Sequence, residues 1–447
     1  MAEMAMPMGS MQKGEIAMDS FHAKELCRKQ QYQAVLMLYQ QKHIDASWTC
    51  WDYYYYAYAL LKTKQYAKGH EISRLGMMTF PQCTQLHYSY CWCLYYLYIQ
   101  PYNEKRDDVR RFRKAADAIL QYSRQEPYSP YTKTVWKVVD TMRGRAGHTA
   151  AEINQYLEKL DPDLLSAEER ESRHGEIPVS MASERERWYS LRSRFLVKEE
   201  RYESCISLCQ EALRVFPQLH HDNEIWFSYR IALCQLRMGK VDEAMQIWQH
   251  LLQYHEHWII YRGLFYGAEA KQDCQAMLQY GAAGMLAGTQ FAEKIHFIAQ
   301  LADILQKLGK EMMAFAHYVF IWKLREQRGW YISVALRQRI ASYHQPIPSW
   351  NMLLDMLYPF WISCKHTGEE PIYGMIETVL PGHTGGFIKT YEGHSYYFKI
   401  DSLYLMDAIK GLYVRFYIQK GRKGPKESAK RAVDIIKAEE KTYDSHY

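Results

Sequence analysis

Three side chains that could bind a metal ion are spaced four residues apart: Cys83, His87 and Cys91, with Cys93 close behind. In a helix this spacing would place the first three on one face, and thiolate and imidazole groups are ligands that zinc prefers. Zinc sites, however, normally draw their ligands from two separate chain elements, and buried cysteines are common in aromatic-rich helices. We therefore expect these cysteines to be structural, and the sequence predicts neither a metal site nor a cofactor.

Other signatures of catalysis are missing from the sequence. The chain has no P-loop, no dinucleotide-binding glycine fingerprint, no G-x-S-x-G motif, no H-E-x-x-H motif and no carboxylate pair at a spacing typical of a hydrolase. An active site assembled from distant residues is an alternative that nothing in the sequence favours. We therefore expect a protein that is not an enzyme.

The spacing of the cysteines and the length of the apolar segments indicate the cellular compartment that we expect for the protein. The ten cysteines are scattered, with no C-x-x-C pair, which favours free thiols in a reducing compartment. The N-terminal residues MAEMAMPMGSMQKGEIAM lack the apolar stretch of a signal peptide, and no apolar run long enough to cross a membrane follows. We expect a cytoplasmic protein without a membrane segment, in which residues 1–15 form a flexible leader.

Basic side chains are concentrated near the C-terminus. The chain carries 56 Lys and Arg against 50 Asp and Glu, a formal net charge of +6. Residues 410–431 hold eight basic side chains and one acidic side chain, so this segment alone accounts for +7 and the remainder of the chain for about −1. We interpret the segment as a candidate phosphate contact, with a solvated loop as the alternative. Residues 105–114 form a second basic strip, for which solvated charge is the default interpretation.

The elements that must position these residues show an internal repeat over the first three hundred residues. Each copy begins with a large residue, which we count as position 1. Position 4 is small, position 8 is usually large, and position 11 is small again. The clearest copy is RYESCISLCQEALRVFP, residues 201–217, and other copies contain Tyr32, Tyr66, Val241 and Ala314. Twelve positions before the first small residue of each copy lies another small residue: Ala23, Ala57, Ser193, Ala232 and Ala302.

This pattern resembles the tetratricopeptide repeat, a helix pair with a period of 34 residues. The resemblance covers at least five units between residues 16 and 328, although the W-x-x-L-G-x-x-Y motif is nowhere intact. It implies stacked helix pairs in which small residues let the paired helices approach each other. It also implies a protein or peptide partner on the concave face, which the first helices line.

In this family the second, fifth and ninth positions of a unit line the groove. The matching residues are Trp51, Tyr54 and Tyr58 in one unit, Arg187 and Arg194 in another, and Trp226, Tyr229 and Leu233 in a third. An aromatic stripe at helical spacing either packs against neighbouring helices or forms a groove for a peptide or an unstacked base. The arginines are either solvated or bind an acidic ligand.

The remaining sequence suggests how the chain is divided. Residues 83–160 are helical but off-period, residues 161–186 are polar and break the periodicity, and no strand-like pattern occurs before residue 370. The predicted divisions are the leader 1–15, a helical array 16–160, a hinge or long loop 161–186, a second array 187–343, a junction with one short helix 344–370, a β domain 371–438 and a tail 439–447.

After residue 370 the hydrophobic periodicity changes to two. GMIETVL, GGFIKTYE, HSYYFKI and GLYVRFYIQKG are strand patterns, separated by Gly- and Pro-containing turns and one helical turn. The predicted fold class is therefore mainly α: a tetratricopeptide-like helical-hairpin solenoid followed by a small antiparallel five-stranded β-barrel.

The strand order resembles the cold-shock domain, a five-stranded barrel of the OB type. The matching segments are 374–379, 383–388, 396–400, 414–416 and 432–435, and the resemblance covers roughly residues 371–438, about a sixth of the chain. In that family single-stranded RNA or DNA stacks on aromatic rings of the second and third strands, inside a basic rim. The resemblance therefore implies a nucleic-acid partner.

Carried over by position, the resemblance assigns base stacking to Phe387 and Tyr397 and a phosphate contact to Lys399, which stands where the family has His. Three aromatic residues of the family pattern are replaced here, by Thr378, Gly385 and Ile400. The implied basic rim consists of Arg415, Lys420, Arg422, Lys423 and Lys426. Because about half of the stacking platform is missing, we expect weak binding with low sequence selectivity.

Together these patterns predict a non-enzymatic adaptor. The repeats bind a protein partner, and the barrel contacts single-stranded RNA or DNA. The alternative is a pure protein-interaction scaffold whose barrel has lost nucleic-acid binding and serves as a docking module or as a cap on the repeats. The sequence does not identify the partner or the oligomeric state.

Overall fold

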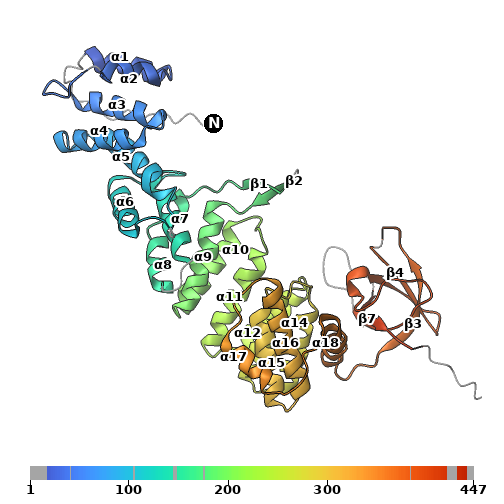
Figure 1. Ribbon diagram of the computed structural model, residues 1–447. Coiled ribbons are helices and arrows are strands. Elements are labelled where there is room, and N and C mark those ends of the chain that lie inside the picture. The colour runs from blue at the N-terminus through green and yellow to red at the C-terminus, as the bar shows by residue number, and fades with distance from the viewer. Residues whose placement is uncertain are drawn as a thin grey trace, which may run out of the picture. The chain divides into compact units, whose positions relative to one another are not determined.

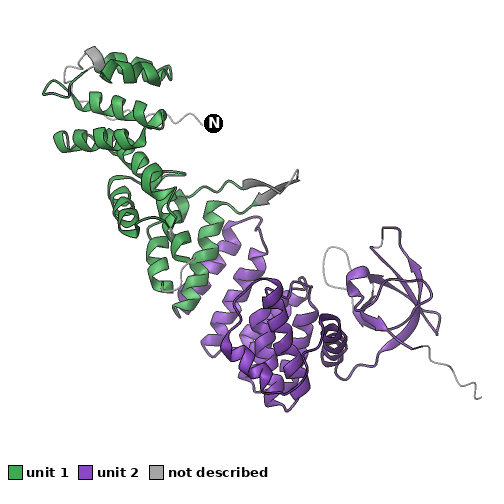
Figure 2. Ribbon diagram, in the orientation of Figure 1, with its two compact units in different colours: residues 1–199 green, residues 200–447 purple. Residues whose placement is uncertain are grey.

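A computed structural model describes residues 18–40, 42–103, 106–143, 148–174, 177–382, 384–419 and 430–439. The chain divides into two compact units, residues 1–199 and 200–447 (Figure 2). The predicted fold class is confirmed: tetratricopeptide-like helical hairpins are followed by a closed five-stranded barrel (Figure 1). The predicted leader and residues 440–447 of the predicted tail lie outside the described residues.

Unit 1 is built almost entirely of helices. Its helices are α1 (Met18–Arg28), α2 (Tyr32–Gln40), α3 (Cys50–Lys62), α4 (Tyr66–Thr79), α5 (Thr84–Leu94), the π-helical turn η1 (Tyr95–Ile99), α6 (Val109–Tyr122), α7 (Pro130–Arg143), α8 (Ala150–Leu157), the 3-10 turn η2 (Pro162–Leu164) and α9 (Glu184–Lys198). The strands in the described part of this unit are β1 (Arg170–His174) and β2 (Ile177–Met181).

Unit 2 combines helices with the barrel. Its helices are α10 (Tyr202–Val215), α11 (Asn223–Arg237), α12 (Val241–Leu252), α13 (Trp258–Ala270), α14 (Cys274–Leu286), α15 (Ile295–Lys307), α16 (Glu311–Gln327), α17 (Val334–Ala341) and α18 (Trp350–Lys365). The barrel contains β3 (Ile372–Val379), β4 (Gly385–Thr390), β5 (Ser395–Lys399), the 3-10 turn η3 (Ile400–Ser402), β6 (Tyr413–Gln419) and β7 (Arg431–Lys437).

Small residues at the repeat positions let the helices of a pair approach closely, as the spacing predicted. The five first-helix positions are all fully buried: Ala23, Ala57, Ser193, Ala232 and Ala302. A methyl group added to Gly76 of α4 would lie 2.7 Å from Cβ of Tyr53 on α3, and one added to Gly263 of α13 would lie 2.3 Å from Cε2 of Trp248 on α12. Larger residues cannot occupy these positions without moving the helices apart.

The segment between the predicted arrays differs from the expectation. The sequence indicated no strand before residue 370, and that was wrong: β1 and β2 pair as an antiparallel hairpin within the predicted hinge 161–186. The boundary between the two units lies at residues 199 and 200, between α9 and α10, which the sequence pattern assigned to one repeat.

The helix predicted in the junction is longer than expected and continues through a proline. Helix α18 spans 16 residues with Pro359 in its interior, and it packs against α14 and α16. Its buried residues Leu353, Leu357, Trp361 and Ile362 belong to the same hydrophobic core as α11–α16. Tertiary packing therefore outweighs the local cost of a proline in the helix.

The barrel closes in the order β3–β4–β5–β7–β6. Its core consists of Ile376, Ile388, Phe398, Val414, Phe416, Ala432 and Ile435. Four of its five strand pairs are antiparallel, as the predicted antiparallel barrel requires, and the fifth pair, β5 with β7, is parallel. Strand β7 closes the barrel, because it pairs antiparallel with β6 on one side and parallel with β5 on the other.

Candidate functional site

The predicted stacking residues lie side by side on the outer surface of the barrel. Phe387 of β4 is directly opposite Tyr397 of β5, with ring centroids 5.7 Å apart and ring planes at 63°. Lys399 lies two residues beyond Tyr397 and therefore on the same face of β5. Phe387 is 37% exposed, Lys399 is exposed and Tyr397 is half-buried. The structure thus brings these three residues together.

Two of the positions that depart from the cold-shock pattern, Thr378 and Gly385, lie beside the predicted stacking residues. Thr378 lies opposite Phe387 on β3, where the family has Trp. Gly385 lies opposite Lys399, and a Cβ at Gly385 would be 2.3 Å from the carbonyl oxygen of Phe398. The backbone is therefore too close at this position for an aromatic side chain, and the predicted platform holds two rings.

Additional aromatic residues on this side of the barrel were missed by position-by-position comparison. Tyr391, in the turn after β4, stacks on Tyr413 of β6 with centroids 6.4 Å apart and planes at 19°. Tyr413 is paired with Met375 of β3, and both Met375 and Tyr391 are exposed. Strand alternation could have indicated them, because Tyr391 follows buried Thr390 and Tyr413 precedes buried Val414.

The predicted basic rim is only partly within the described residues. Arg415 is half-buried on β6 opposite Tyr373 of β3. Four of the predicted residues lie outside the described residues: Lys420, Arg422, Lys423 and Lys426. Arg431, at the end of the basic segment, has another role: its Nε donates to Oε1 of Gln419 at 2.8 Å, and its Nη2 is 3.6 Å from Oε2 of Glu256, in the loop before α13.

The strands β6 and β7 are covered by the helices of unit 2. Tyr417, Val433 and Ile436 belong to the hydrophobic core of those helices. The ring of Tyr404 stacks on Tyr358 of α18 with centroids 4.7 Å apart. The helices therefore cover one side of the barrel, whereas Phe387 and Lys399 remain exposed on another.

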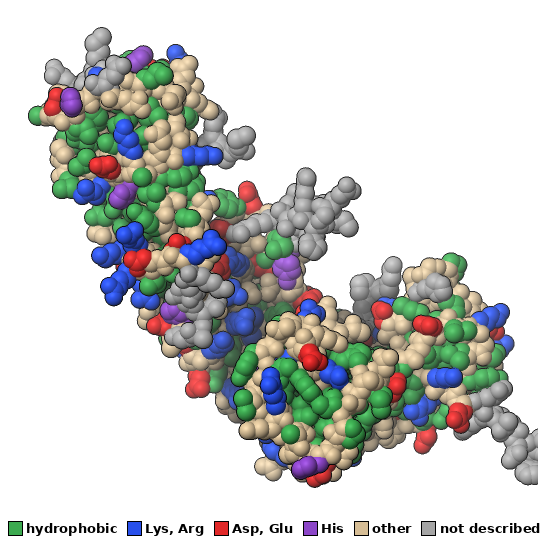
Figure 3. Space-filling view, in the orientation of Figure 1, with side chains coloured by type: hydrophobic (Ala, Val, Ile, Leu, Met, Phe, Trp, Pro, Cys, Tyr) green, Lys and Arg blue, Asp and Glu red, His purple; other side chains and the backbone are tan. Residues whose placement is uncertain are grey.

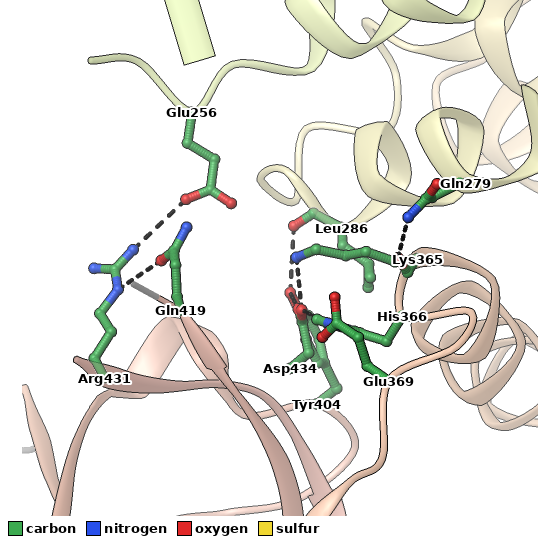
Figure 4. Close-up of polar contacts among 10 residues, drawn as sticks. All are labelled: Glu256, Gln279, Leu286, Lys365, His366, Glu369, Tyr404, Gln419, Arg431 and Asp434. Atoms are coloured by element: carbon green, nitrogen blue, oxygen red, sulfur yellow. Dashed lines mark hydrogen bonds and ion pairs between the residues drawn. The ribbon is translucent and has the colours of Figure 1, made fainter. Parts of the chain in front are cut away.

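A buried ion cluster holds this contact together (Figure 4). Oδ2 of Asp434 in β7 lies 2.6 Å from Nζ of Lys365 and 2.7 Å from Nε2 of His366. The other ring nitrogen of His366 lies 2.8 Å from Oε2 of Glu369. His366 also stacks on Tyr417 of β6, with centroids 3.7 Å apart and planes at 4°.

The charges of the cluster shift one another's pKa values. Burial alone would raise the pKa of Asp434, but Lys365 and the hydrogen bond from His366 outweigh it, so the Asp434 pKa lies below its ordinary value. Burial alone would lower the pKa of Lys365, but Asp434 outweighs it and the Lys365 pKa is raised. Both groups are therefore charged near neutral pH.

The predicted groove residues of unit 1 lie in a surface row of rings. Trp51, Tyr54 and Tyr58 are half-buried on α3. The centroids of Trp51 and Tyr54 are 6.0 Å apart, and those of Tyr54 and Tyr58 are 5.8 Å apart. Burial beside Tyr58 and Tyr55 raises the pKa of Tyr54. Arg194 of α9 is exposed.

Two predicted groove residues of unit 2, Trp226 and Tyr229, differ in how deeply they are buried. Trp226 is half-buried, but Tyr229 is only 2% exposed, so the prediction that Tyr229 lines a groove is corrected. Its ring packs 5.8 Å from that of Trp248, and its hydroxyl accepts a hydrogen bond from Nη2 of Arg262 at 3.3 Å. Tyr229 faces the core because α12 and α13 both pack against α11.

The candidate metal ligands do not converge. Cys83 is the N-cap residue of α5, Cys91 is fully buried, and His87 packs against the ring of Tyr122 with centroids 5.1 Å apart. Among the residues that the structure describes, no group of three or more His, Cys, Asp or Glu side chains could hold a metal ion. In the same residues no helix is long and apolar enough to cross a membrane.

The second basic strip is solvent-facing. Figure 3 shows Lys and Arg side chains gathered over this part of unit 1. The described members of the strip are all exposed: Arg106 before α6, and Arg110, Arg111, Arg113 and Lys114 on α6. The guanidinium of Arg111 is 3.9 Å from Asp108, the N-cap residue of the helix. Lys105 lies outside the described residues.

Comparisons with known proteins add little to this description. No family model matches the chain, and no curated protein matches its sequence. Among solved structures, MamA (residues 41 to the end) from Desulfovibrio magneticus RS-1 is similar at 12% identity and a TM-score of 0.28, over 44% of this chain and 96% of that one. The APC/C hetero-tetramer Cut9–Hcn1 is similar at 12% identity and a TM-score of 0.31, over 78% of this chain and 80% of that one. These likenesses are too low to indicate a function.

Proposed function

We propose that the protein is an adaptor whose helical repeats bind a protein partner and whose barrel binds single-stranded nucleic acid on its β3–β4–β5 face. The observation that carries this proposal is the way the barrel is covered. Its contact with the helices uses β6 and β7, while Phe387 and Lys399 stay exposed beside Tyr397. The resemblance to the cold-shock domain assigns nucleic-acid binding to these three positions.

The arrangement is suited to weak binding with low sequence selectivity. A ring pair can stack with any base, because every base has a π-face, and each stacked base contributes about 1–3 kcal/mol. Lys399 has no ion pair among the described residues and is available for a phosphate. With two rings in place of a full platform, we expect the backbone charge to supply much of the affinity.

A titration of the full-length protein with fluorescein-labelled oligo(U) and oligo(dT) tests the proposal. Replacing Phe387 or Tyr397 by Ala should weaken binding about tenfold, because 1.4 kcal/mol is a factor of ten and lies within the stacking range. Tyr331→Ala, which removes an exposed ring from the loop before α17, should leave the affinity unchanged. Lys399→Gln should reduce the salt dependence of binding.

Two outcomes of the titration would contradict the proposal. Binding that is independent of salt, or binding that both ring variants leave unchanged, would show that the nucleic acid does not occupy this face. Point variants are preferable to deleting residues 371–447, because that deletion would remove Tyr404, whose ring stacks on Tyr358 of α18, and would uncover Tyr358. Far-ultraviolet circular dichroism confirms that each variant is folded.

A second candidate function is supported by the same contact. Tyr417, Val433 and Ile436 share one core with α11–α18, as expected of a barrel that caps a stack of helices and no longer binds nucleic acid. In that case no oligonucleotide would bind at any salt concentration, and replacing Ile436 by Asp would destabilise the helices of unit 2 as well as the barrel.

A further inference from the structure

A continuous row of aromatic rings runs across α3, α5 and η1 in unit 1. We name it the aromatic face, and it consists of Trp51, Tyr54, Tyr58, Tyr88, Trp92 and Tyr96. Successive ring centroids along the row are 6.0, 5.8, 6.2, 6.3 and 5.6 Å apart. Tyr88 is 39% exposed and the other five are half-buried. A contiguous surface of this kind is typical of a binding site.

The orientation of the rings distinguishes between ligand classes. Tyr54 and Tyr58 are stacked with planes at 27°, and Trp92 and Tyr96 are stacked at 22°. Tyr66 stacks on Tyr96 at 17° with centroids 4.7 Å apart. The remaining pairs of the row are edge-to-face or tilted, with planes at 84° for Trp51 and Tyr54 and at 65° for Tyr88 and Trp92. The row therefore offers a ligand ring edges and hydroxyl groups as well as ring faces. A nucleobase stacks on ring faces only, whereas a peptide backbone and its side chains can use edges and hydroxyl donors as well.

The charged side chains that lie over rings of the aromatic face are basic. Asp52 is the sole acidic residue in the sequence of α3, α5 and η1. Its carboxylate is buried, where it accepts hydrogen bonds from the hydroxyl of Tyr39 at 2.9 Å and from the backbone of Thr49 at 2.8 Å. Nζ of Lys62 lies 5.1 Å from the ring centroid of Tyr58, and Nζ of Lys133 lies 5.1 Å from that of Trp92. A ligand that covers the rings would meet two ammonium groups and no exposed carboxylate from these helices.

We propose that the aromatic face binds an extended, proline-containing peptide that carries acidic residues. A polyproline II segment has no internal hydrogen bonds, so its carbonyl groups can accept from tyrosine hydroxyls, and its rings dock against rows of aromatic side chains. Acidic residues on the peptide would pair with Lys62 and Lys133. The inference rests on the proposed protein-binding function of the repeats and specifies the chemistry of the partner.

Selection from a displayed library of random dodecapeptides on the full-length protein tests this inference. The expected result is enrichment of peptides that contain both Pro and Asp or Glu. A peptide synthesised from the enriched set should bind at least tenfold more weakly to Tyr88→Ala and should bind Tyr254→Ala normally, since Tyr254 is an exposed tyrosine of unit 2.

Charge reversal gives a readout that loss of folding cannot imitate. With Lys62→Glu and Lys133→Glu combined, the selection should change from acidic to basic peptides that still contain Pro. Failure to enrich any peptide class, enrichment without Pro and acidic residues, or competition by oligo(U) at this face would overturn the inference. Peptides that bind the repeats but are unaffected by Tyr88→Ala would also overturn it, while leaving the proposed protein-binding function standing.

Discussion

Replacing Asp434 by Asn removes one charge from the centre of the contact between the barrel and α18. Asp434 is 3% exposed, and its carboxylate lies 2.6 Å from Nζ of Lys365 and 2.7 Å from Nε2 of His366. Removing one partner of a buried ion pair costs about 3–5 kcal/mol, because the other charge stays buried without compensation. Asn keeps the size of the side chain and tolerates the left-handed backbone at this position, where φ is +52°. We therefore expect a cost near 3 kcal/mol, the lower end of the range.

Hydrogen exchange measured by mass spectrometry reports this change locally. A loss of about 3 kcal/mol corresponds to a roughly 100-fold faster exchange of the amides of β7 and the end of α18 when exchange follows local opening. Asp401→Asn, an exposed carboxylate in η3, is the matched control and should have little effect. Combining Asp434→Asn with Lys365→Met should restore part of the protection, since the uncompensated charge is then gone.

The same cluster predicts a pH dependence with a definite sign. Because the pKa of Asp434 is lower in the folded protein than its ordinary value near 4, its contribution is complete above about pH 4 and is lost as the pH falls through the lower value. The stability of the Asp434→Asn variant should lack this acid-sensitive contribution. If exchange in β7 and α18 is no faster in Asp434→Asn than in Asp401→Asn, the ion cluster does not hold the barrel on the helices.

Two further predictions concern the helical core of unit 2. His317 is fully buried. Its Nδ1 is hydrogen-bonded to the carbonyl oxygen of Met313 at 2.6 Å, and its Nε2 accepts a hydrogen bond from Nε1 of Trp361 at 2.9 Å. Burial lowers the pKa of His317 to about 4. The contribution of neutral His317 to the free energy of unfolding should therefore be complete above about pH 6.5, and this free energy should fall by about 3 kcal/mol as the pH decreases toward 4. In urea unfolding, the free energy of the His317→Gln variant should depend less on pH over that window. Gly263→Ala places a methyl group 2.3 Å from Cε2 of Trp248 and should lower the unfolding free energy by about 1–3 kcal/mol, whereas Gly239→Ala tests backbone strain alone, because φ is +83° there with no atom within 4 Å.

The repeat positions could be predicted because they follow from spacing alone. Ala57 and Ala232 are buried since a helix pair with this offset must place them where the two helices touch. The burial of Tyr229 could not be predicted in the same way. Both Tyr229 and Trp226 occupy one-face positions on α11, and their different exposure depends on how α12 and α13 pack against that helix. Periodicity identifies a face, and tertiary packing decides how deeply each residue of that face is buried.

The two candidate surfaces were predictable to different degrees. The pairing of Phe387 with Tyr397 follows from alternation and strand order, both of which are visible in the sequence. The aromatic face was recognised only in part: the repeat offsets indicated Tyr58 but not Tyr88 or Trp92, which lie in the off-period segment. Its extension depends on α5 packing beside α3, a contact that no spacing rule specifies.

The side of the barrel that meets the helices is encoded in the strand sequences themselves. Residues 432–436 of β7 read A-V-D-I-I and are all buried, because Ala432 and Ile435 face the barrel core while Val433 and Ile436 face the helices. A strand that is buried on both faces loses the polar alternation of a solvent-facing strand. By contrast, β4 alternates buried Ile388 with exposed neighbours. The loss of alternation in β7 thus marks the docked side, and its retention in β4 marks the side that is left for a ligand.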